Sequence, residues 1–298
     1  MISIIICSVD PQLLRKLVLN IRETIGVEFE IIAPDNSIDK FGICKVYNES
    51  AAKAKFPIIC FLHEDISIDT KNWGVLVCNY LADPHTGMLG IAGGDTKSRV
   101  PAPWAISAFS NEINVIQHDK FNNKPARHIV ITNPERTGKL KQVVTLDGVW
   151  LCTKKEIFDQ FRFDETTFPG FHGYDVDFSL QVNSRYKLYV VFDIIIHHYS
   201  EGTPDRNWLE STMLVSKKWR RHLPVSVYPL SKSQYIMHHW LSLKIFLLHL
   251  IRLKFSYPKI LKYYFAYSFT RYFSFRKFLS TGKYLLSNIF RNLKNGQV

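Results

Sequence analysis

The stretch FPIICFLHEDISI, residues 56–68, indicates both the fold of this chain and the position of its site. Its apolar run IICFL stops abruptly at His63, Glu64 and Asp65. A buried strand of a parallel sheet shows this pattern when it delivers polar groups to a ligand crevice, which in open α/β sheets lies at the carboxyl ends of the strands. Asp65, together with either His63 or Glu64, could then reach one cation or one phosphate. The alternative interpretation is a solvated turn after a strand.

The residues before this stretch alternate between strand and helix patterns, which predicts a parallel sheet with right-handed crossovers. Five elements are expected: a strand at residues 3–7, a helix at 11–24, a strand at 29–33, a helix at 42–55 and the strand at 58–62. No GxxxxGK[ST] phosphate loop is present, and SVDPQ follows the first strand where a GxGxxG would be expected. A nucleotide would therefore depend on carboxylates and a metal ion.

Two residues that follow the first and second strands are candidate nucleotide contacts. Ser8 ends the first strand, and Asp35 follows the second strand within PDNS. Asp35 is thus expected at the same sheet edge as residues 63–65, where its carboxylate would accept hydrogen bonds from a base or a ribose. An Asx turn is the alternative role for this aspartate.

Further candidates come from the second half of the expected sheet. Residues 95–141 have weak periodicity and are expected to form an elaborated region with one hairpin. In VVTLDGVWLCTKKEIF, residues 143–158, Asp147 and Gly148 interrupt an apolar strand. This interruption predicts either a backbone bend at a ligand or a β-bulge.

Two later segments add an acid and a pair of histidines. Within FHGYDVDFSL, Asp175 opens a helix, where it could cap the helix or act as a general base. Asp177 would point about 200° away around that helix and could not share this role. The run LYVVFDIIIHHYS ends in His197 and His198, which strand alternation turns to opposite faces, so at most one is expected in the site.

Cysteine usage favours a reducing compartment. The five cysteines are widely spaced, mostly within apolar runs, and form no CxxC pair, so they are expected to be small buried apolar residues. The apolar N-terminus has no positively charged region and no cleavage pattern, and it is expected to be the first strand of a cytoplasmic domain.

The last third of the chain has a different composition. The net charge of the protein is +12, but residues 1–210 carry 22 Lys/Arg and 26 Asp/Glu, whereas residues 211–298 carry 16 Lys/Arg and no acid. Apolar runs at 234–255 are too short to span a bilayer. Interleaved aromatic and basic residues favour helices on an anionic membrane surface, with a packed helical subdomain as the alternative. Nucleic acid is not expected as a partner, because no recognised motif is present and the aliphatic content is high.

The order of these motifs resembles glycosyltransferase family 2, in its bacterial glycosyltransferase-like branch, over about residues 2–203. The resemblance implies an α/β, Rossmann-like GT-A fold with a mostly parallel central sheet, here called the N-terminal unit (residues 1–204). A basic, aromatic-rich helical extension (residues 205–298) follows it.

The resemblance also implies roles for the candidate residues. Asp35 would contact the base, and HED would replace the DxD element, with Asp65 on the metal and diphosphate. Asp175 would be the general base. His63 and either His197 or His198 would bind a metal ion. The residues expected near the sugar or acceptor are Asp147, Gly148, His172 and Tyr174. His63 departs from the usual first Asp of DxD, and Tyr174 departs from the Glu that usually precedes the base.

The sequence therefore predicts an inverting glycosyltransferase that uses Mn²⁺ or Mg²⁺ to move a hexosyl or deoxyhexosyl group from a nucleotide sugar to a glycan or lipid-linked glycan. It would be cytoplasmic and peripheral on the inner face of the membrane. One alternative is a catalytically inactive transferase fold that acts as a binding or assembly module. Another is a basic nucleic-acid-binding protein.

Overall fold

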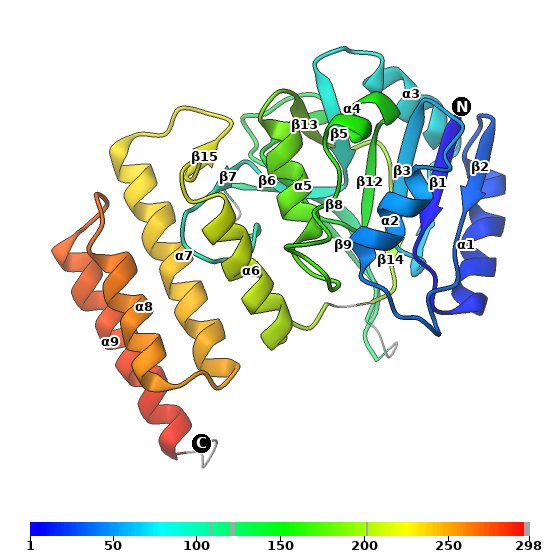
Figure 1. Cartoon of the computed structure of the whole chain (residues 1–298). Helices are drawn as coiled ribbons and strands as arrows, with labels where there is room; N and C mark the ends of the chain where they lie inside the picture. The colour runs from blue at the N-terminus through cyan, green and yellow to red at the C-terminus, as the bar shows by residue number, and fades with distance from the viewer. Residues whose placement is uncertain (108, 120–122, 201, 295–298) are drawn as a thin grey trace.

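A computed structural model describes residues 1–107, 109–119, 123–200 and 202–294 (Figure 1). Its central sheet has seven strands, and five of them run in one direction while β10 and β12 run against their neighbours. The order across the sheet is β10 (Leu140–Val143), β13 (Lys187–Val191), β5 (Thr86–Gly90), β12 (Trp150–Lys154), β3 (Ile58–Leu62), β1 (Ile2–Ile6) and β2 (Phe29–Ile32). The expected mostly parallel α/β sheet is confirmed.

Helices cover both faces of this sheet, and each face has its own apolar core. Helices α1 (Pro11–Thr24) and α3 (Trp73–Leu81) bury Leu17, Trp73 and Val77 against one face. The other face is covered by α2 (Ile43–Ala51), α4 (Lys155–Gln160) and α5 (Tyr174–Asn183). Because both faces are buried, the strands are continuous apolar runs, as IICFL in β3 illustrates.

A second sheet crosses the carboxyl ends of the first. Its order is β11 (Thr145–Leu146), β6 (Ala92–Gly94), β8 (Asn111–Gln117), β14 (Ile196–His198) and β4 (Ile66–Ile68), with β9 (Arg127–Ile131) paired to β8. The β8–β9 pair is the hairpin expected within residues 95–141. A short ribbon of β7 (Thr96–Lys97) and β15 (Val225–Ser226) joins this region to the helical extension.

The helical extension contains α6 (Arg206–Lys218), α7 (Lys232–Arg252), α8 (Tyr257–Ser268) and α9 (Phe275–Lys294). In Figure 1, α7 lies between α6 and the α8–α9 pair. Its apolar residues, such as Trp240, Phe246 and Leu250, are fully buried in a third core, so this side of α7 packs inside the protein. No helix within the described residues is long and apolar enough to cross a bilayer.

The expectation that all five cysteines are unpaired is wrong for two of them. Cys60 and Cys152 form a disulfide between β3 and β12. The antiparallel register of these strands places the two residues directly opposite each other, although 92 positions separate them in sequence. Cys7, Cys44 and Cys78 are free thiols, and only Cys44 among them is fully buried.

Candidate functional site

Most of the sequence candidates line one cavity of about 850 Å³ at the carboxyl ends of β1 and β3, whereas Ser8, Asp35 and His197 lie outside its lining. Residues from many separate elements line it, because the second sheet and the start of α5 fold over the same edge of the central sheet. The polar lining residues include His63, Asp65, Asp147, Asp175 and His198.

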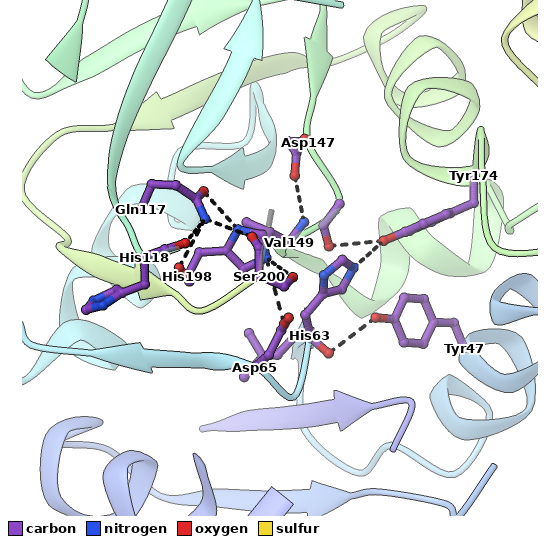
Figure 2. A network of polar contacts seen from close by, with 12 residues as sticks. Tyr47, His63, Asp65, Gln117, His118, Asp147, Val149, Tyr174, His198 and Ser200 are labelled. Carbon is purple, nitrogen blue, oxygen red and sulfur yellow. Dashed lines mark hydrogen bonds and ion pairs between the residues drawn. The ribbon is translucent and has the colours of Figure 1, made fainter. Parts of the chain in front are cut away.

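Three of these residues form a compact cluster. One ligand atom from each of His63, Asp65 and His198 lies within 4.8 Å of the other two. His63 and Asp65 follow β3 directly, whereas His198 belongs to β14. Antiparallel pairing of β14 with β4 sets His198 opposite Ile66, and its Nε2 consequently lies 3.8 Å from Asp65 Oδ1 (Figure 2).

Hydrogen bonds define which nitrogen of His198 carries the proton, and Ser200 Oγ lies 3.3 Å from the other nitrogen, Nε2. The Nε2 amide group of Gln117 donates to the backbone carbonyls of residues 118, 198 and 200, at 3.0, 3.2 and 2.7 Å. This fixes the orientation of the amide, so its Oε1, 3.2 Å from His198 Nδ1, must accept a hydrogen bond from the N–H of that nitrogen. The lone pair of His198 is therefore on Nε2, the atom that faces Asp65.

A second network orients His63. The Tyr174 hydroxyl lies 3.2 Å from the carbonyl oxygen of Gly148 and 3.0 Å from His63 Nε2. Because a carbonyl can only accept, the tyrosine proton goes to Gly148, and His63 Nε2–H donates to the hydroxyl oxygen. This leaves Nδ1 of His63 with a lone pair. A Cβ atom at Gly148 would lie 2.0 Å from the Tyr174 hydroxyl oxygen, so this contact requires glycine.

The donor set fits a divalent cation. Two neutral imidazoles and one carboxylate are suitable ligands for such an ion, and second hydrogen bonds of this kind are typical of ligating histidines. The three residues that would hold the ion are His63, Asp65 and His198. His197 does not join them, because its ring bonds His118 and Asp69 instead, at 2.8 Å each.

Asp175 and Asp147 form the acidic part of the cavity. Asp175 Oδ2 accepts a hydrogen bond from the Gly148 amide at 3.2 Å. Burial, followed by the charge of Asp147, raises the pKa of Asp175 to about 7. Asp147 accepts hydrogen bonds from Trp104 Nε1 and from the Val149 amide, both at 3.1 Å. Gly173, not Asp175, occupies the N-cap position of α5.

The two candidate nucleotide residues lie at the same edge but make internal contacts. Ser8 pairs with Asp35 in an isolated parallel β-bridge. The Ser8 hydroxyl donates to Glu64 at 2.8 Å, so Glu64 is engaged by the loop after β1. Asp35 is exposed, and its carboxylate accepts the Ser37 amide at 2.8 Å, which is the Asx turn considered from the sequence. These hydrogen bonds lower the pKa of Asp35.

The remaining lining residues include one candidate and several that the sequence did not indicate. His172 lines the cavity, and its Nε2 lies 3.8 Å from Asp205 Oδ1 at the start of α6. Gln117 and Trp104 were not expected, because both belong to the weakly periodic segment 95–141. Trp104 places an indole beside Asp147, and Gln117 orients His198.

A family model described as "Glycosyltransferase like family" matches residues 3–221, about three quarters of the chain. The chain belongs to the glycosyltransferase-like family. Because the match extends past the N-terminal unit, α6 falls within the region that is typical of this family. The N-terminal unit thus has the fold that the motif order indicated.

The proteins that this glycosyltransferase-like chain resembles include distant ones. The Streptomyces griseus streptomycin biosynthesis protein StrF is 24% identical over 155 residues, which cover 51% of this chain and 50% of StrF. GalNAc-T7, solved with UDP, GalNAc and Mn²⁺, superposes with a TM-score of 0.52 at 12% identity, over 90% of this chain and 55% of that one. S. aureus TarS 1–349 superposes with a TM-score of 0.50 at 12% sequence identity, over 89% of this chain and 78% of that one. The chain thus spans about half the length of StrF and GalNAc-T7, and the solved structures share its fold.

Proposed function

We propose that this protein is an inverting glycosyltransferase that moves a hexosyl or deoxyhexosyl group from a nucleotide sugar to a glycan or lipid-linked glycan. The observation that carries the proposal is the shared cavity of the His63–Asp65–His198 cluster and Asp175. One part of the cavity suits the diphosphate of a donor, and the other supplies a carboxylate whose pKa is near neutrality.

In this proposal, His63, Asp65 and His198 hold Mn²⁺ or Mg²⁺. The cation, when bound, offsets the charge of the departing nucleoside diphosphate. Ser8 and Asp35, at the neighbouring loop ends, are the contacts that we assign to the nucleoside. Asp35 is exposed and can receive a ligand without loss of a buried interaction.

Asp175 acts on the acceptor in this proposal. As the acceptor oxygen forms its bond to the anomeric carbon and the bond to the diphosphate breaks, the hydroxyl proton passes to Asp175. A base on the sugar face opposite the leaving group gives inversion. A pKa near 7 suits a base that must be ionised before the step and must hold the proton after it. Asp147, Gly148, Tyr174 and His172 would line the path of the sugar and acceptor.

A lipid-linked acceptor would place the enzyme at the surface of a membrane, and we propose peripheral attachment there through the helical extension. The basic residues after position 210 support this attachment, because no acidic residue in the same segment offsets their attraction to anionic lipid. Nucleic acid is not proposed as a partner.

Calorimetric titration with UDP, dTDP, GDP and CMP, each with and without Mn²⁺, tests the proposed site. We expect metal-dependent binding of one nucleotide, lost in Asp65→Ala and retained in His197→Ala, whose ring lies outside the cluster. Binding of none of the four by a folded protein would contradict the proposal and favour a non-catalytic binding module.

A further inference from the structure

Exposed apolar side chains gather on α8, α9 and the turn between them. Between 39% and 66% of each of these side chains is exposed. We call this surface the aromatic face, and its members are Leu261, Phe265, Phe269, Phe273, Phe275, Leu279, Leu286 and Phe290. In Figure 1, α8 and α9 form the end of the molecule that is farthest from α1 and β2.

The apolar residues of α9 form a stripe. At about 100° per residue, Phe275, Leu279, Leu286 and Phe290 fall within about 60° of arc. A different side of α9 is buried, through Thr281 and Leu285. The helix thus uses one side to pack on its neighbours and leaves a second apolar side uncovered.

Contacts among the rings make the surface continuous from α8 to α9. Phe269 lies 6.3 Å from Phe265 and 5.5 Å from Phe273, measured between ring centroids, and both pairs are stacked. The ring of Phe278 lies 5.5 Å from that of Phe269 and connects the two helices. Because the rings support each other, the surface is formed before any partner arrives.

Basic side chains border the stripe. Arg276, Lys283 and Arg291 are exposed and lie about 80–160° around α9 from Phe275, directly beside the apolar arc. No acidic residue occurs after Glu210 in the sequence. An apolar strip whose charged neighbours are all cations matches the boundary between the acyl chains and the headgroups of an anionic bilayer.

We propose that the aromatic face docks on an anionic lipid bilayer, with the phenyl rings at the level of the acyl chains and the basic residues on headgroup phosphates. A second copy of the chain is a poorer occupant, because it would bring identical positive borders together. The attachment is peripheral, since no described helix can span. It does not require transferase activity, so vesicle binding and nucleotide binding can fail independently.

Sedimentation of the full chain with vesicles tests this docking. We expect at least about tenfold stronger partition onto vesicles of equal parts phosphatidylcholine and phosphatidylglycerol than onto phosphatidylcholine alone, and the difference should shrink at high salt. The triple variant Phe269→Ser, Phe275→Ser, Phe290→Ser should lose about tenfold or more in partition. The matched control is Phe109→Ser, which removes an 81% exposed phenylalanine from the N-terminal unit and should leave partition unchanged.

A second variant separates charge from apolar contact. This variant should abolish the preference for anionic vesicles, and it combines Arg276→Glu, Lys283→Glu and Arg291→Glu. Equal sedimentation of the triple serine variant and the wild type would overturn the proposal. The proposal would also be overturned if the wild type did not bind vesicles but formed a dimer that the serine variant converts to a monomer. Retention of the wild type on single-stranded nucleic acid without retention on vesicles would overturn it too. Circular dichroism confirms that each variant is folded.

Discussion

Gln117 and His198 are 81 positions apart in sequence, yet Gln117 Oε1 lies 3.2 Å from His198 Nδ1 and fixes the tautomer of that histidine. The parallel pairing of β8 with β14 sets Gln117 beside His198. The hydrogen bonds of Gln117 to three carbonyls leave its amide a single orientation. A neighbouring residue of the cavity wall therefore determines that the lone pair of His198 is on Nε2, the nitrogen nearest Asp65.

Gln117→Leu should lower Mn²⁺ affinity by roughly 10- to 100-fold, because His198 loses the acceptor that holds its proton on Nδ1. Calorimetric titration with Mn²⁺ measures the change. Gln12→Leu, at an exposed position on α1, serves as the control and should bind as the wild type does. Unchanged Mn²⁺ binding by Gln117→Leu would show that the amide does not position the ligand.

The two adjacent histidines should behave differently. His198→Ala should lower Mn²⁺ affinity by at least about tenfold, since one of three ligands is lost. His197→Ala should leave it unchanged, because His197 bonds Asp69 and His118 away from the cluster. Mn²⁺ titration followed by electron paramagnetic resonance distinguishes the pair. The reverse ranking would mean that the site is built around the other histidine.

His63 should set the choice of metal. Two imidazoles favour Mn²⁺ or Co²⁺ over Mg²⁺, which prefers oxygen ligands. We expect His63→Asp to narrow the ratio of Mn²⁺ to Mg²⁺ affinity by about tenfold or more, because it replaces a nitrogen ligand with oxygen. Competition titrations in the absence of nucleotide give both affinities. A ratio that does not move would exclude His63 from the coordination sphere.

Asp175→Asn should reduce turnover by roughly 10²- to 10⁴-fold and leave donor binding nearly intact, as the loss of a general base requires. In the wild type, the rate should rise with pH through about 7, where Asp175 ionises. Steady-state kinetics and donor titration measure the two effects. An equal loss of donor binding would assign Asp175 to the nucleotide instead.

The same pKa has a consequence for stability. Because the pKa of Asp175 is raised above its unfolded value, ionisation of this group opposes folding. The free-energy penalty grows as pH rises from 3.8 to about 7 and is constant above that. Asp175→Asn should therefore raise the melting temperature more at pH 8 than at pH 5. A rise in melting temperature of equal size at pH 8 and pH 5 would show that burial does not perturb the pKa of this carboxyl group.

Asp177 anchors α6 to the N-terminal unit. Its side chain is fully buried and accepts hydrogen bonds from Lys218 Nζ at 2.8 Å and from Trp219 Nε1 at 2.7 Å. Lys218→Met should cost about 2 kcal/mol of unfolding free energy, because it leaves a buried carboxylate short of its cation.

Lys155→Met is the matched control for this prediction. Lys155 and Lys218 are each 30% exposed in the side chain, but Asp159, the partner of Lys155, is 45% exposed. The control should cost less than about 1 kcal/mol in the same urea titration. Equal losses of unfolding free energy in the two variants would mean that the burial of Asp177 does not increase the contribution of its ion pair to stability.

The sequence was sufficient to place His63 and Asp65, because an apolar strand that ends in polar residues can only deliver them to the edge of the sheet. It could not choose between His197 and His198. Alternation shows that they face opposite ways, but which face meets the cavity depends on the pairing of β14 with β4 and β8, whose residues are distant in sequence.

Other features depended on register that no local pattern encodes. Gln117 belongs to a segment of weak periodicity, and its function arises only when β8 and β14 pair. The disulfide was missed for the same reason, since Cys60 and Cys152 meet only through the antiparallel register of β3 and β12. Asp35 was correctly placed at the sheet edge, and the Asx turn that the PDNS pattern also predicted for it is present.

The division of charge along the chain gives the molecule an electrical dipole. Residues 1–210 have a slight excess of acids, and all 16 charged residues after them are basic. Near an anionic surface, the resulting torque would turn the α8–α9 end inward and the N-terminal unit outward before any contact forms. Diffusional encounter would then begin in a productive orientation, with the cavity-bearing half of the molecule held toward the aqueous phase, where nucleotide sugars are dissolved.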